Sequence, residues 1–255
     1  NTLCFSYPYS PYLFEYFSKP LQNKRIDHEK IIGILLITGF VIPALVFVQK
    51  DIGTCAIISG SFLLMFVFSP LNRKDKFQAF KWIIIGGMAC ALVYILASGS
   101  LLSGAQKSRL SFFNPCQTSK YKGEGYQVCN AFIAINRGRL TGVGIGKSTQ
   151  KYSYIPEPHT DMVFAIISEE YGFIVGLIIL LSYIIIIWRI LKLATYATSL
   201  TGRYICLGVA TFIFLHIFIN LGGLFGIIPL TGVPLPFLSY GGSFIIALLV
   251  SIALV

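Results

Sequence analysis

The chain has 255 residues, of which 55% are hydrophobic and 12% charged, with a formal net charge of +10. Soluble globular proteins carry about 25% charged residues, so this composition excludes a water-soluble domain and predicts an integral membrane protein. The apolar runs are continuous, whereas membrane barrels show alternating segments of about ten residues. The sequence therefore predicts a helical membrane protein.

A membrane-spanning helix needs about 20 apolar residues. The stretch Leu3–Phe17 is broken by two prolines and is at most a partial span. Because the chain starts at Asn1 and stops in an apolar run, we expect a piece of a longer protein. The predicted fold is all-α, a polytopic transmembrane helix bundle that forms one domain over 1–255. Its expected spans are Ile31–Val48, Ile52–Pro70, Trp82–Leu102, Met162–Trp188, Tyr204–Pro229 and Pro236–Val255.

Three short segments rich in Lys and Arg separate these spans: Lys19–Lys30, Asn72–Lys81 and Arg189–Arg203. Short basic loops stay in the cytoplasm, so the long interval 103–160 is predicted to lie outside the cell. This interval is itself basic, but long loops cross the membrane largely regardless of their charge. Its charge suits either an anionic ligand at the lipid headgroup level or contact with anionic headgroups alone, and composition does not separate the two.

Within this outer loop, Gly125–Gly138 has apolar residues at helical spacing and a glycine at its end. This pattern predicts a short amphipathic helix that ends at Gly138. The helix would pack on the membrane domain as a lid, which is also compatible with roofing a cavity. Cys116 and Cys129 share the loop and could form a disulfide, but two cysteines do not define a framework. No His/Cys cluster suggests a metal.

The next segment, Gly142–Gly146 followed by Lys147 and Ser148, superficially resembles a phosphate-binding loop. It is one residue short of GxxxxGK[ST], and no strand precedes it. A nucleotide site is therefore not expected, and we favour a backbone turn that approaches a lipid phosphate.

Asp161 closes the run Pro-Glu-Pro-His-Thr-Asp and is expected in the first turn of a membrane helix. Aspartate is a favoured N-cap, so a structural role competes with that of a general base at the water–lipid boundary. His159 could bind, titrate or simply pack. Glu169 and Glu170 lie on different sides of the same helix, so at least one must face protein or water. We interpret both as structural partners of a cation or of the backbone.

The last motif, Gly226–Ser243, is dense in proline and glycine at a membrane boundary. Such backbone must be buried in protein or line a cavity. It is therefore either architectural or in direct contact with a ligand.

These segments together resemble the shape, elongation, division and sporulation (SEDS) family of bacterial cell-wall polymerases. The resemblance covers roughly residues 19 to 255, and its specificity lies in the order and spacing of the motifs. Gln150-Lys with the Pro-Glu-Pro-His-Thr-Asp run favours the division branch. The matching stretches are Gln49-x-Asp51-x-Gly-Thr54, Gly125-Tyr-Gln, Ile133-Ala-Ile, Gly142-x-Gly-x-Gly, Pro156-Glu-Pro-His-Thr-Asp161, Glu169-Glu-x-Gly172 and Pro229-Leu-Thr-Gly-Val-Pro-Leu-Pro-Phe-Leu-Ser-Tyr-Gly-Gly-Ser243.

The resemblance implies a peptidoglycan glycosyltransferase that polymerises lipid II at the outer face of the bacterial plasma membrane. Its implied catalytic base is Asp161, which would deprotonate the acceptor sugar. A divalent cation, Mg²⁺ or Mn²⁺, could assist, although no dedicated site is evident. The implied partners are lipid II, membrane lipid and a class B penicillin-binding protein, with no nucleic acid. The predicted substrate-binding residues are Arg109, Lys147, Lys151, Glu157, His159 and Ser239.

Two other functions remain open, a flippase for the lipid-linked precursor and a non-catalytic scaffold of the cell-wall synthesis complex. A transporter would be expected to show internal repeats and ionisable groups at the membrane midplane, and the sequence has no visible repeat. The chain departs from the family pattern at Asn114, where aspartate is common, and at Lys50, where proline is usual. Neither departure removes Asp161. The family has about ten spans and this chain about six, so a fragment could be inactive.

Overall fold

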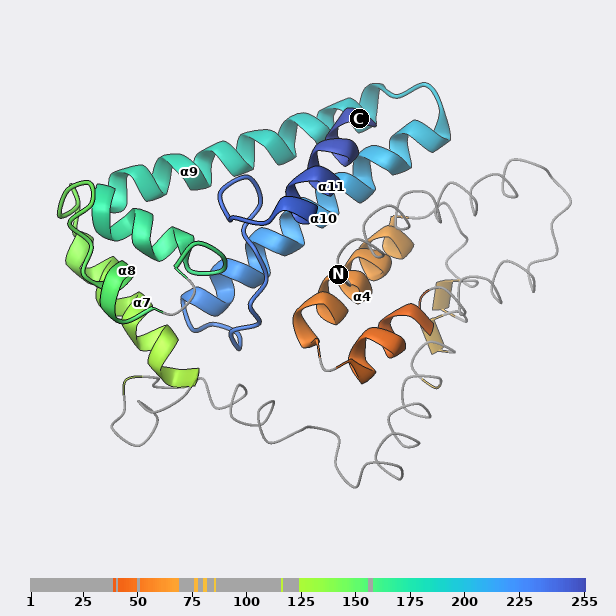
Figure 1. The fold of residues 1–255 in the computed structure, drawn as a ribbon. Coiled ribbons are helices and arrows are strands. Elements are labelled where there is room, and N and C mark those ends of the chain that lie inside the picture. Colours follow the sequence, from red (N-terminus) through yellow and green to blue (C-terminus); the bar gives the residue numbers. More distant parts are fainter. Residues whose placement is uncertain are drawn as a thin grey trace, which may run out of the picture. The chain divides into compact units, whose positions relative to one another are not determined.

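The structure is a computed structural model. It describes residues 39, 41–49, 51–68, 76–77, 80–81, 85, 116, 124–155 and 158–255. All regular elements in these ranges are helices (Figure 1), which confirms the all-α class. Two of them are long and apolar enough to cross a membrane, Val163–Tyr196 and Gly202–Leu224. The expected spans 31–48 and 82–102 fall mostly outside the described residues.

The chain divides into two compact units. In the first, a helix covers residues 41–48 and α4 covers Ile52–Val67. Asp51 caps α4, because its carboxylate accepts hydrogen bonds from the backbone N–H of Thr54 at 3.0 Å and from its hydroxyl at 2.6 Å. The helix ends three residues before the expected Pro70, and the Lys76 ammonium donates to the carbonyl oxygen of Val67. Such a cation satisfies a helix end that lacks internal partners.

The second unit contains Leu102–Trp188 and His216–Ile245. Its helices are α7 (Glu124–Gly138), α8 (Gln150–Ser153), most of α9 (Val163–Tyr196) and the end of α10 (Leu200–Leu224). α7 confirms the predicted amphipathic helix and its glycine stop. Ala131 and Ala134 are fully buried, and they join α7 to a core built from α9, α10 and the following loop.

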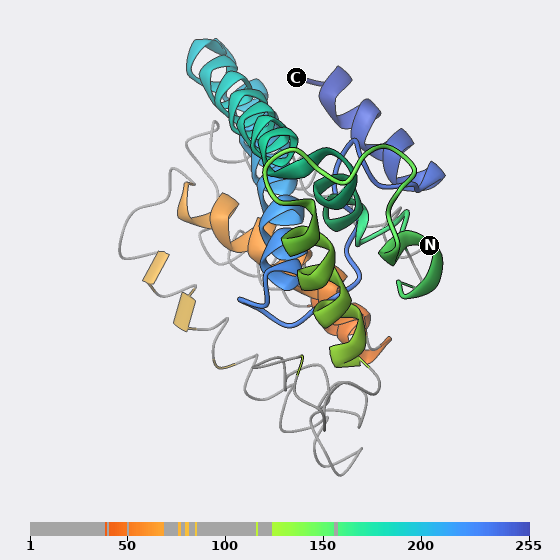
Figure 2. The ribbon, with the colours of Figure 1, turned by 90° about the vertical axis from the view of Figure 1, so that its left-hand side faces the viewer.

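α9 is two helical segments that meet at Gly172, whose φ of 85° and ψ of 176° interrupt the helix. This backbone region is essentially restricted to glycine. Figure 1 shows the change of direction, and Figure 2 shows α7 ending close to it. The loop after α7 pairs with the bend: Phe173 N–H donates to the carbonyl of Arg139 at 2.8 Å, and Val143 N–H donates to that of Glu169 at 2.9 Å. Sequence periodicity had predicted one uninterrupted span here.

Several boundaries of the last three expected spans were wrong, although the expected start at Met162 lies one residue before that of α9. α9 begins at Val163 and continues to Tyr196, so part of the basic segment 189–203 is helical. α10 ends at Leu224 instead of 229, and α11 (Gly242–Ala253) begins at 242 instead of 236. The residues between them are apolar but rich in proline and glycine, and Gly226 and Gly232 have positive φ. Hydropathy alone extended the spans through this non-helical loop.

Candidate functional site

Asp161 is buried, with 8% of its surface exposed, two residues before α9 begins. The sequence had placed it inside the first turn. The first helical carbonyl belongs instead to Met162, which accepts from Ala165 N–H at 3.0 Å. The carbonyl of Asp161 has a different partner, the side-chain amide of Asn220 at 2.9 Å. That bond holds Asp161 outside the helix.

Asn220, on α10, joins two segments that are distant in the sequence. Its amide nitrogen donates both to Asp161 and, at 2.7 Å, to the carbonyl of Val233. Asn220 is only 2% exposed, so these bonds are shielded from competing water. Its amide therefore fixes the backbone at Asp161 relative to the proline-rich loop 225–241.

The loop holds the preceding residues as well. The Ser239 hydroxyl donates to the carbonyl of Thr160 and accepts from Leu235 N–H at 2.7 Å. Tyr240 N–H donates to the carbonyl of His159 at 2.8 Å. Three consecutive carbonyls, from 159 to 161, are thus each bound by a group from α10 or the loop. This confirms that the loop has an architectural role, and it places that role directly around the candidate base.

The Asp161 carboxylate faces the loop. One oxygen accepts from the Thr160 hydroxyl at 3.2 Å, and the other lies 3.9 Å from the position that a Cβ would take on Gly232. Gly232 has a φ of 71°, so a larger residue there would be strained, although its Cβ would make only an ordinary contact with this oxygen. Phe237, a non-glycine residue, also has a positive φ of 65°. Backbone strain of this kind clusters at functional sites.

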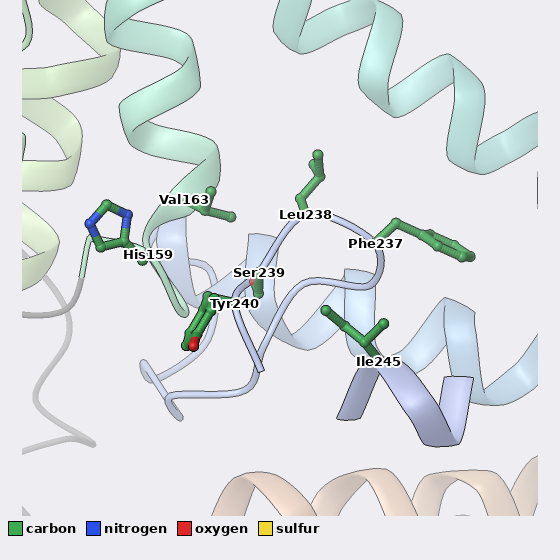
Figure 3. A pocket seen from close by; sticks show the side chains of 7 residues that line it. All are labelled: His159, Val163, Phe237, Leu238, Ser239, Tyr240 and Ile245. Atoms are coloured by element: carbon green, nitrogen blue, oxygen red, sulfur yellow. The ribbon is translucent and has the colours of Figure 1, made fainter. Parts of the chain in front are cut away.

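A pocket of about 430 Å³ opens beside this arrangement (Figure 3). Figure 3 shows side chains from the start of α9, the loop and α11 around it. The Phe237 ring stacks on Tyr183, whose hydroxyl donates to the carbonyl of Pro236. The lining is mainly apolar with a few polar groups, as is usual for small-molecule sites. Its residues are His159, Val163, Phe237, Leu238, Ser239, Tyr240 and Ile245.

Glu169 is fully buried in a second polar cluster, on the first segment of α9. Its carboxylate accepts from the Ser148 hydroxyl and, at 3.3 Å, from Thr149 N–H. The Arg137 guanidinium lies 3.8 Å from the same carboxylate. A buried carboxylate is tolerated when it is paired and hydrogen-bonded, so this cluster ties the segment after α7 to α9. The structural interpretation of Glu169 is confirmed.

Glu170 is also buried, and its carboxylate lies 4.0 Å from the Lys151 ammonium. Lys151 therefore has a structural partner in addition to the ligand role predicted for it. The Lys147 side chain is exposed. Both glutamates therefore face protein, whereas the sequence required at least one of them to face protein or water.

The structure brings His159, Ser239 and Asp161 together, whereas Lys147 and Lys151 belong to the segment around Glu169 and Glu170. Arg109 and Glu157 lie outside the described residues. Their ligand roles stay predictions. Sequence reasoning missed Asn220 and Tyr183, whose polar groups sit within apolar helices. The cost of such groups in a membrane is the signal that could have found Asn220.

Cys116 and Cys129 form a disulfide, which settles the pairing that the sequence left open. Cys129 is a buried residue of α7, so the bond attaches an upstream point of the loop to this helix.

Among the described residues, no group of three or more His, Cys, Asp or Glu side chains is placed to hold a metal ion. The predicted divalent cation has no ligand set there.

The chain is similar to known proteins over most of its length. Stage V sporulation protein E of Bacillus subtilis is 35% identical over 86% of this chain and 58% of its own length. A probable peptidoglycan glycosyltransferase FtsW of Dichelobacter nodosus is 35% identical over 91% and 57%. Peptidoglycan glycosyltransferase MrdB of Escherichia coli is 34% identical over 88% and 58%. The chain thus spans somewhat less than three fifths of these relatives.

A solved structure described as "Structural coordination of polymerization and crosslinking by a peptidoglycan synthase complex" has a chain with the same fold. The TM-score is 0.56 at 23% identity, over 99% of this chain and 80% of that one. The family of FtsW, RodA and SpoVE, described as "Cell cycle protein", matches residues 10–255. The predicted resemblance is confirmed: the chain belongs to this family.

Proposed function

We propose that the chain is the part of a peptidoglycan glycosyltransferase that carries its catalytic base. The substrate would be lipid II, a disaccharide-peptide on undecaprenyl diphosphate, and the product a glycan strand. Relatives at 34–35% identity are named peptidoglycan glycosyltransferases. The observation that carries the proposal is the Asp161 carboxylate, buried at the start of an apolar helix on a backbone fixed by Asn220 and Ser239.

In the proposed reaction, Asp161 removes the proton from the acceptor sugar hydroxyl. The hydroxyl oxygen forms a bond to the anomeric carbon of the donor sugar, and the bond from that carbon to the diphosphate breaks. The electron pair leaves with the diphosphate oxygen, and the proton stays on the carboxylate. A positioned base of this kind contributes about 10²–10⁴ in rate.

The pocket beside Asp161 suits one part of this substrate. Phe237, Leu238 and Ile245 offer apolar surface for a lipid or for the face of a sugar ring, and exposed His159 borders it. The leaving diphosphate needs cations, for which we retain Arg109, Lys147 and Lys151. Glu157, His159 and Ser239 complete the proposed contacts.

The deciding experiment uses the full-length protein with Asp161→Asn, assayed for polymerisation of purified lipid II. Asparagine keeps the size and the polar character of the side chain but cannot accept the proton. We expect a folded protein whose polymerisation is lost. Asp51→Asn is the matched control, because it makes the same chemical change at a carboxylate that caps α4. Asparagine still caps a helix, so this variant should remain active.

Substantial polymerisation by Asp161→Asn would overturn the base assignment. Transport of lipid II across vesicles without polymerisation, by the wild-type protein, would favour a flippase. Normal growth of cells that carry Asp161→Asn would favour a scaffold.

The location and partners follow from the same proposal. We infer a multi-pass protein of the bacterial plasma membrane with residues 103–160 on the outer face, where lipid II is used. A class B penicillin-binding protein is the proposed partner, which the description of the similar solved structure, a peptidoglycan synthase complex, supports. Copurification of the two proteins from membranes tests the partner. Labelling of Tyr152→Cys, at a position that is 69% exposed, by a membrane-impermeant maleimide on intact cells tests the topology.

A further inference from the structure

Residues 139–147, the loop between α7 and α8, expose apolar and cationic side chains together. Leu140 is 64% exposed and Ile145 74% exposed. Arg139 and Lys147 are exposed as well. The sequence from 125 to 156 contains four cations and no acidic residue. Two exposed aliphatic side chains flanked by cations are unfavourable in water but suit a membrane interface, where cations reach the headgroups.

The loop is held rigidly. Gly142 lies so close to α9 that a Cβ on it would be 2.2 Å from the carbonyl oxygen of Glu170. Gly144 N–H donates to the same carbonyl at 3.0 Å. These contacts hold the backbone between Leu140 and Ile145 against α9, and both side chains therefore point away from the protein.

The loop joins α9 where its apolar surface begins. The carbonyl of Leu140 accepts from Ile174 N–H at 3.4 Å, and Phe173 and Ile174 are themselves 55% and 51% exposed. From Phe173 to Trp188 the sequence of α9 contains no charged residue. In a helix apolar enough to cross a membrane, this exposed surface faces lipid. Leu140 extends it, and the neighbouring cations then lie at the headgroup level.

We propose that residues 139–147 form an interfacial anchor that binds the anionic headgroups of membrane phospholipid and inserts Leu140 and Ile145 beneath them. The occupant is bulk phospholipid: no residue of this loop lines the pocket beside Asp161, and the apolar surface is continuous with that of α9. The anchor fixes the bend of α9 relative to the bilayer surface. Lys147, which the proposed function retains as a cation for the diphosphate, would serve both roles. The anchor itself requires no lipid II, and the vesicles that test it contain none.

The test places a fluorescent probe in the loop by Ile145→Trp, after both native tryptophans, Trp82 and Trp188, are replaced by phenylalanine. The full-length protein is reconstituted in phosphatidylcholine vesicles with or without phosphatidylglycerol. We expect quenching by lipids brominated near the headgroup and weak quenching by aqueous acrylamide. Phe173→Trp in the same background provides the depth reference, and the two probes should be quenched to similar extents.

The charge contribution is tested by Arg139→Gln combined with Lys147→Gln. Each cation near an anionic surface strengthens binding of the loop to the headgroup region about fivefold. Without both cations, quenching in vesicles with phosphatidylglycerol should therefore equal that in phosphatidylcholine alone. Arg189→Gln with Lys192→Gln removes the same charge at the other end of α9 and should leave the probe unchanged. Strong quenching of the probe by acrylamide in both kinds of vesicle would overturn the proposal. Protection of the probe only after a partner membrane protein is added would overturn it as well.

Discussion

Gly172→Ala tests the bend of α9, on which the position of the loop after α7 depends. A non-glycine residue at a φ of 85° and ψ of 176° costs about 1–3 kcal/mol in backbone strain. A Cβ would also lie 2.4 Å from both the amide nitrogen of Gly142 and the carbonyl oxygen of Leu140. Neither atom belongs to a flexible side chain, so the loop itself must move.

Moving the loop breaks its backbone pairing with α9. Four hydrogen bonds join residues 139–144 to residues 169–174, and each contributes about 1 kcal/mol net. Loss of two to four of them, added to the strain, predicts a destabilisation of about 3–7 kcal/mol. Because the damage is local, the loop should open before the rest of the protein unfolds.

The assay is limited trypsin digestion of the purified protein, followed by thermal unfolding. The exposed loop residues Arg139 and Lys147 are the cleavage sites, and Gly172→Ala should be cut there much faster than the wild type. Gly176→Ala, one helical turn later, is the matched control: its Cβ would meet Phe164 and Ser168 at 3.4 Å, an ordinary contact. Alanine in a helix stabilises by about 0.5–1 kcal/mol relative to glycine. Equal protease resistance of Gly172→Ala and the wild type would refute the role assigned to the bend.

Three further predictions concern the groups that hold the site. Asn220→Ala leaves two buried carbonyls without their amide donor, which predicts that the free energy of unfolding falls by about 2–6 kcal/mol. Thermal unfolding measures this change, and an unchanged midpoint would contradict the bridging role of Asn220. Glu169→Leu should destabilise the protein far more than Glu169→Gln in thermal unfolding, because glutamine can still accept from the Ser148 hydroxyl. Equal stability of the two variants would show that the hydrogen bonds to Glu169 contribute little. Reduction of the Cys116–Cys129 disulfide, which joins residues 13 apart, should cost about 2–4 kcal/mol and expose α7 to protease, whereas Cys129→Ser should no longer respond to reductant.

The local patterns that sequence can express were predicted well. The low charge content and continuous apolar runs indicated a helical membrane protein, and amphipathic spacing with a terminal glycine predicted α7 to within one residue of its start. The order and spacing of several motifs, the one around Asp161 among them, indicated the family, which the similarity over residues 10–255 confirms. Each of these features can be read along the chain without knowledge of tertiary contacts.

The arrangement around Asp161 was not predictable, because its contacts join residues far apart. Asn220 is 59 residues from Asp161, and Ser239 is 79 residues from Thr160. Hydropathy could not show that apolar residues 225–241 are not helical. Backbone carbonyls that lack helical partners there accept hydrogen bonds from side chains distant in the sequence. Nor could periodicity reveal the bend at Gly172, whose conformation is fixed by contact with Gly142 and Leu140. The sequence by itself determined the class of protein, its helices and its candidate base, whereas only tertiary contacts decided where the helices end and how the base is held.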